Sequence, residues 1–162
     1  MAKLYLMMGI PGAGKSTFVA NHIKENQIWV SRDTIRFNLV AEEEEYFSRE
    51  TEVFNCFIKS INSYLSQGID VFADATHLSI ASRRKVLSRI TTKPSSIEVI
   101  WIKTDLNAAL AQNELRKGTR AYVPPSVIRR THSQLEAPTF EEGFSTIYEV
   151  KKNKPILERR EM

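Results

Sequence analysis

One short segment of the sequence combines the residue types that suit phosphate binding. Gly9–Thr17 reads GIPGAGKST, and we call it the phosphate loop. Its glycines permit a tight turn and a close backbone approach to anionic oxygens. Lys15 can reach the terminal phosphates of a nucleoside triphosphate, and the Ser16 hydroxyl can ligate Mg²⁺. A simple glycine turn would not explain Lys15 and Ser16 in this register. The predicted ATP-binding residues of the loop are Gly12, Ala13, Gly14, Lys15, Ser16 and Thr17.

A second cluster, Ser31–Arg36, reads SRDTIR and follows a short apolar run. Asp33 can accept a proton from an attacking hydroxyl, as a general base does in phosphoryl transfer. Arg36 lies one helical turn further on, and with Arg32 it can bind an anionic substrate. The alternative is that Asp33 only caps a helix while Arg36 is exposed.

A third cluster, Asp74-Ala-Thr76-His77, follows the apolar run Val71–Ala73. An acid in this place can hold a metal-bound water or orient a substrate, so Asp74 is a candidate for either role. The pattern equally allows Asp74 to cap the helix that begins near Ser79. We expect His77 to be part of the loop structure rather than a metal ligand.

Basic residues gather in two further segments. The segment from about 112 to 130 contains arginines beside Gly118 and a proline pair, which is typical of a lid that closes over phosphates. We predict that Arg116 is catalytic and contacts ATP together with Arg120, and that Arg129 and Arg130 lie on the surface. The second segment is a basic strip that either follows a nucleic-acid backbone or is a solvated helix face. It consists of Arg83, Arg84, Lys85 and Arg89.

The elements that must position these residues alternate between strands and helices. Strands are predicted at 3–8, 28–30, 69–73 and 97–102, and another at 146–150. Helices are predicted at 15–26, 33–39, 46–67, 79–90, 105–117 and 126–135. This order indicates an α/β fold, a three-layer sandwich with a mostly parallel central sheet and a small helical lid. Ligands of such sheets bind at the carboxyl ends of the strands, where Gly9, Asp33, Asp74 and Asp105 should meet.

Composition and length indicate one globular domain. The chain has 162 residues, a formal net charge of +4 and one cysteine, so no internal disulfide framework is possible. We assign residues 1–150 to the domain and 151–162 to a charged C-terminal tail. The short apolar start is too soon interrupted for a signal peptide, and no apolar run approaches membrane-spanning length. We therefore expect a cytoplasmic protein without a membrane partner.

Taken together, the motifs resemble the 5′-kinase domain of phage-type polynucleotide kinase over roughly residues 3–135. The matching segments are the phosphate loop, Ser31-Arg-Asp-x-x-Arg36, Asp74-x-Thr76, Asn113-x-x-Arg116, Gly118-Thr-Arg120-Ala and Val123-Pro124. The resemblance implies ATP with Mg²⁺ as donor, the 5′ end of DNA or RNA as partner, and a phage-type protein in a host cell. It also implies that Asp33 is the general base, Arg36 binds the phosphate next to the 5′ nucleotide, and Arg116 binds the donor phosphates. The same resemblance implies that Asp74 and Thr76 line the acceptor side.

The sequence departs from that family in several places. Gln112 and His77 stand where the family often has arginine and asparagine, and one extra residue separates Asn113 from Gly118. The Asp-x-Asp-Gly-Thr motif of the family's phosphatase domain does not occur, so no 3′-phosphatase activity is expected. The leading hypothesis is a polynucleotide 5′-hydroxyl kinase. The alternatives are a kinase of small molecules or modified nucleotides, and an ATP-binding regulatory switch.

Overall fold

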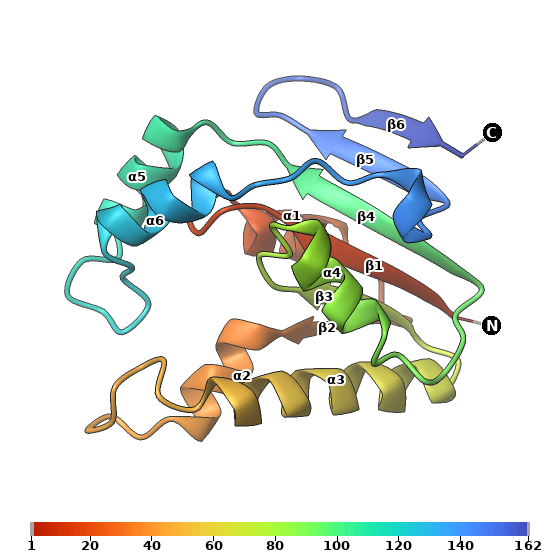
Figure 1. Cartoon of the computed structure of the whole chain (residues 1–162), viewed down its shortest axis with the longest axis horizontal. Helices are drawn as coiled ribbons and strands as arrows, with labels where there is room; N and C mark the ends of the chain where they lie inside the picture. The colour runs from red at the N-terminus through yellow and green to blue at the C-terminus, as the bar shows by residue number, and fades with distance from the viewer. Residues whose placement is uncertain (1, 162) are drawn as a thin grey trace.

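The computed structural model describes residues 2–161 as a six-stranded sheet with helices on both faces (Figure 1). The strands are β1 (Lys3–Met8), β2 (Gln27–Ser31), β3 (Asp70–Asp74), β4 (Ser96–Ile102), β5 (Thr146–Val150) and β6 (Leu157–Arg160). The helices are α1 (Lys15–His22), α2 (Arg32–Leu39), α3 (Glu50–Ser66), α4 (Ile80–Leu87), α5 (Leu106–Glu114), α6 (Pro125–Ser133) and the 3₁₀ turn η1 (Phe140–Glu142). No helix within the described residues is long and apolar enough to cross a membrane.

The strand order is β2-β3-β1-β4-β5-β6, and every pair except β5–β6 is parallel. β1 shows how the layers form, because its successive side chains point to opposite faces. Leu4, Leu6 and Met8 pack in a core with α3 and α4, whereas Met7 packs in a second core with α1, α5 and α6. The predicted three-layer α/β sandwich with a mostly parallel sheet is therefore confirmed.

The predicted start of α3 at Tyr46 is wrong. The helix begins at Glu50, and residues 46–49 form turns instead. The apolar residues of the segment have helical spacing, but Tyr46 and Phe47 pack edge to face with each other at 5.0 Å, and Tyr46 packs against Phe37 of α2. Tertiary contacts with α2 thus decide the conformation of this segment, which lies beside the cavity described below.

The charged tail contributes β6, which the sequence analysis does not predict. Residues 157–160 pair antiparallel with β5, and all four side chains of the strand are exposed. Arg159 donates a hydrogen bond to Glu149 across the pair at 2.5 Å. A strand at the sheet edge with no buried face lacks the apolar alternation by which strands are recognised.

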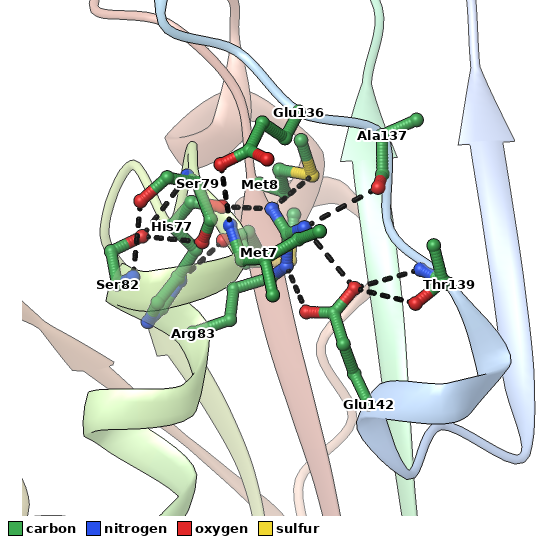
Figure 2. A network of polar contacts seen from close by, with 11 residues as sticks. Met7, Met8, His77, Ser79, Ser82, Arg83, Glu136, Ala137, Thr139 and Glu142 are labelled. Atoms are coloured by element: carbon green, nitrogen blue, oxygen red, sulfur yellow. Dashed lines mark hydrogen bonds and ion pairs between the residues drawn. The ribbon is translucent and has the colours of Figure 1, made fainter.

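Arg83 does not belong to a nucleic-acid-binding strip, because its side chain is fully buried. Figure 2 shows its guanidinium between α4 and η1, where it pairs with Glu142 at 2.6 Å. It also donates to the carbonyl of His77 at 2.8 Å and to that of Ala137 at 3.4 Å. Arg83 therefore joins the loop after β3 to the segment before β5. The other three residues of the predicted strip, Arg84, Lys85 and Arg89, are exposed.

Candidate active site

The phosphate loop joins β1 to α1 and forms an anion-binding turn. Gly12 and Gly14 have φ values of 82° and 102°, which non-glycine residues rarely adopt. A side chain at Gly12 would also meet the Ala109 carbonyl oxygen of α5 at 2.6 Å. No side chain caps the first turn of α1, so its N–H groups are directed at the loop's concave side without a partner from a capping residue. The local sequence thus builds a cradle for phosphate oxygens.

Lys15 lies across this cradle. Its ammonium group donates hydrogen bonds to the carbonyls of Gly9 at 2.9 Å and Ile10 at 3.1 Å. Burial lowers the pKa of Lys15, while the nearby carboxylate of Asp74 acts in the opposite direction. The amine is thus held at the mouth of the loop by contacts that an incoming phosphate can replace.

Asp74 at the end of β3 is a partner of the loop and not a helix cap. It is 5% exposed and accepts hydrogen bonds from Ser16 Oγ and Trp29 Nε1, each at 3.0 Å. Burial raises the pKa of Asp74, while Lys15 lowers it. Ser79 fills the capping position of α4 instead. The sequence predicts Trp29 as a strand residue but does not indicate that its side chain bonds to Asp74.

The Ser16 hydroxyl and the Asp74 carboxylate suit a hard cation such as Mg²⁺, because both present oxygen ligands 3.0 Å apart. The residues described, 2–161, contain no cluster of three or more His, Cys, Asp or Glu that could hold a metal alone. This donor set fits a Mg²⁺ ion that takes its remaining ligands from phosphate oxygens and water.

Asp33 lies in the first turn of α2 and does not cap it, since the Ser31 hydroxyl accepts from the Thr34 amide in that role. The Asp33 side chain is 69% exposed, and its Oδ1 accepts from Arg36 at 2.5 Å. Arg36 is nearly buried, which contradicts the alternative of an exposed surface arginine. The remaining carboxylate oxygen of Asp33 has no hydrogen-bond donor among the described residues.

Glu50 organises the two arginines beside Asp33. It accepts three hydrogen bonds from Arg36, the shortest at 2.6 Å, and lies 3.7 Å from Arg32. The rings of Tyr46 and Phe47 cover the Arg36 guanidinium at 5.3 and 4.9 Å. These three residues were not predicted as site residues, because the sequence places them inside a helix.

Arg32 is held less completely than Arg36. Its Nε is buried and finds no hydrogen-bond partner among residues 2–161. Burial lowers the pKa of Arg32, and Glu50 opposes this effect. A buried cationic donor without an acceptor is costly. The Arg32 side chain also lines the cavity, where its other guanidinium N–H groups can bind an anionic ligand.

The predicted lid contains a loop that is closed by hydrogen bonds, and its two arginines, Arg116 and Arg120, contact different parts of the protein. The Asn113 side chain exchanges two hydrogen bonds with the backbone of Val123, at 2.6 and 3.0 Å, and so closes the loop between them. Arg116 faces the phosphate loop across the cavity. Arg120 instead donates to the carbonyls of Val40 and Ala41 at 2.8 and 3.2 Å, so it joins the lid to the end of α2.

These elements enclose one cavity of about 330 Å³, which we call the central cavity. The predicted residues that line it are Gly12, Gly14, Lys15, Ser16, Thr17, Arg32, Asp33, Arg36, Asp74, Thr76 and Arg116. Ala13 and Arg120, both predicted to bind ATP, are not among its lining residues. The arrangement places a phosphate cradle on one side of a single space, and a carboxylate with two arginines on the other.

A model of the AAA domain family (AAA_33) matches residues 4–138 of the chain. One similar solved structure is a chain of the Pnkp1/Rnl/Hen1 RNA repair complex, with 24% identity and a TM-score of 0.69 over 83% of this chain. The match covers 44% of that longer chain, so the present chain spans less than half its length.

Two other similar structures are matched over most of their length. Kti12 of Chaetomium thermophilum, solved in complex with ADP-AlF3, has 15% identity and a TM-score of 0.69, over 93% of this chain and 89% of that chain. A sugar kinase from Janibacter sp. HTCC2649 has 14% identity and a TM-score of 0.64, over 96% and 88%. At these identities the likeness establishes the fold, which is that of P-loop kinases, and leaves the acceptor undetermined.

Proposed function

Because the chain belongs to the AAA domain family and has the fold of P-loop kinases, we propose that it is an ATP-dependent kinase acting on the 5′-hydroxyl of a polynucleotide. One observation carries the proposal. The central cavity brings an exposed carboxylate, Asp33, together with a half-buried arginine, Arg32, whose Nε has no hydrogen-bond acceptor among residues 2–161. A neutral alcohol would contact only the Asp33 carboxylate. A nucleotide that carries a 3′-phosphate would place its 5′-hydroxyl on Asp33 and its phosphate on Arg32.

In the proposed reaction the acceptor oxygen forms a bond to the γ-phosphorus, the bond to the β–γ bridging oxygen breaks, and ADP leaves. Asp33 takes the proton of the acceptor hydroxyl. The contact between Arg36 and Asp33 Oδ1 orients the carboxylate and leaves its other oxygen for that hydroxyl. Arg32 and the remaining N–H of Arg36 hold the phosphate on the 3′ side of the reacting nucleotide, which positions the hydroxyl.

On the donor side the phosphate loop and the first turn of α1 bind the phosphate oxygens of ATP. Lys15 exchanges its two backbone carbonyls for these oxygens, and Arg116 approaches them from the lid. Ser16, with Asp74 through water, would hold Mg²⁺, which supplies charge neutralisation to the β- and γ-phosphates when bound. Thr76 also lines the cavity and would contact the acceptor.

The test is an acceptor panel with labelled ATP. It compares 5′-hydroxyl DNA and RNA oligonucleotides, nucleoside 3′-monophosphates, the matching nucleosides and small sugars. We expect the 3′-monophosphate to be phosphorylated roughly ten- to a hundredfold more efficiently than the nucleoside, the scale of one charge-assisted contact. Equal efficiency for these two, or a preference for a sugar, would instead indicate a small-molecule kinase. ATP binding with no phosphorylated acceptor would indicate a regulatory switch.

A further inference from the structure

Three cations from two segments of the chain surround one aromatic ring outside the central cavity. The ring is that of Phe54 in the second turn of α3. It lies 5.5 Å from the Arg32 guanidinium, 4.5 Å from the Lys85 ammonium and 5.8 Å from the Arg89 guanidinium. We call Arg32, Lys85 and Arg89 the basic track. Their attraction to the ring face holds them together in spite of their mutual repulsion.

Two cations of the basic track, Lys85 and Arg89, are not neutralised by an acidic side chain among the described residues. Lys85 and Arg89 are exposed, and neither forms an ion pair or a side-chain hydrogen bond with any residue in the range 2–161. Arg83, only two positions before Lys85, is in contrast fully buried and paired with Glu142. Helix α4 therefore presents Arg83 to the core, while Lys85 of the same helix and Arg89 of the turn after it stay free and raise the local concentration of anions.

The basic track is continuous with the central cavity through Arg32, which belongs to both. Figure 1 shows α3 and α4 on the same face of the sheet, with α2 at the end of α3 that lies nearest the lid. Asn62 of α3 also donates a hydrogen bond to the backbone carbonyl of Arg89, at 3.0 Å, which ties α3 to the turn that follows α4. A chain that leaves the cavity past Arg32 therefore meets Lys85 and Arg89 next.

Given the proposed function, on which this step rests, we infer that the basic track binds the phosphates downstream of the first acceptor nucleotide. Single-stranded nucleic acid is bound by a positively charged groove that follows its backbone. Phe54 is only 6% exposed, so its ring cannot stack with a base and serves to hold the cations. The contacts are therefore made to phosphates alone, and the track accepts single-stranded DNA and RNA of any sequence.

The experiment compares Lys85→Gln/Arg89→Gln with the control Arg84→Gln/Lys93→Gln. The control removes the same charge from exposed residues of the same region that do not contact Phe54. The substrates are a 5′-hydroxyl octanucleotide and a nucleoside 3′-monophosphate. We expect the track variant to lose about tenfold in kcat/KM on the octanucleotide, through KM, because two exposed charge contacts are lost. Its activity on the mononucleotide, and both activities of the control, should not change.

Salt dependence provides a second readout that a merely structural role would not change. The slope of log kcat/KM against log salt concentration, measured on the octanucleotide, should decrease by about 0.7 for each lost phosphate contact. Equal losses on both substrates, or the same loss in the control, would overturn the inference. So would a wild-type protein that gains nothing from the longer acceptor, although the proposed function would then still stand on the mononucleotide.

Failure of the proposed function has a different signature. The wild type would then phosphorylate no nucleotide. In that case the affinity for a fluorescent octanucleotide, measured directly, tests the basic track independently of catalysis. Binding that the track variant weakens and the control retains supports the track, whereas binding that is absent or equal in all three proteins overturns it. Melting temperatures within about 2 °C of wild type should confirm that both variants fold, as is usual for surface substitutions.

Discussion

His77 should make the protein sensitive to acid, and His77→Asn should reduce that sensitivity. The side chain is 4% exposed, and Nδ1 donates a hydrogen bond to the Met7 carbonyl at 2.6 Å. Its other nitrogen, Nε2, is buried without a partner among the described residues. Burial lowers the pKa of His77 to about 4, and the charges of Arg32, Lys15 and Arg83 act in the same direction.

The size and sign of the effect follow from the protonation of the two states. Between pH 6.5, the ordinary pKa, and about 4, the unfolded chain binds a proton at His77 that the folded protein excludes. The free energy of unfolding is therefore highest above pH 6.5 and decreases as the pH falls. At about 1.4 kcal/mol for each pH unit, the loss is about 2 kcal/mol at pH 5 and about 3 kcal/mol at pH 4.

Asparagine is the matched replacement, because its amide nitrogen occupies the place of Nδ1 and it tolerates the φ of 45° at this position. It has no titrating group. Urea unfolding of both proteins at pH 7, 6 and 5 measures the difference in pH dependence. The variant starts with a constant loss from the smaller side chain, but its stability should fall less steeply. Parallel curves for the two proteins over this range would refute the reasoning.

Three other predictions concern the site and its support. Asp33→Asn should lower turnover by roughly 10²–10⁴-fold with ATP affinity unchanged, and turnover within a few-fold of wild type would exclude Asp33 as the base. Arg32→Gln and Arg36→Gln should each abolish most of the preference for a nucleoside 3′-monophosphate over the nucleoside, measured as a ratio of kcat/KM values. Arg83→Met should cost about 3–5 kcal/mol in urea unfolding because it leaves Glu142 buried and unpaired. Adding Glu142→Gln should restore much of that stability, and an unchanged single variant would contradict the buried pair.

The features that depend on neighbouring residues could be predicted from the order of the amino acids alone. The phosphate loop is one contiguous segment whose glycines adopt the backbone angles that only glycine accepts easily. The alternation of strands and helices follows from local hydrophobic periodicity, so the parallel sheet and its layers were predictable. The convergence of Asp33 and Asp74 on the phosphate loop also follows, because the ends of parallel strands meet at one edge.

Which charged residues are paired and which are free became visible only in the folded protein. Arg83 and Lys85 are two positions apart in one basic run, yet one is buried against Glu142 and the other is exposed over Phe54. Glu50 is read from sequence as part of a helix, but it holds Arg36 beside Asp33. The burial and the partner of a side chain depend on segments that packing brings together from distant parts of the chain. Local periodicity cannot predict these contacts, because it depends only on neighbouring residues.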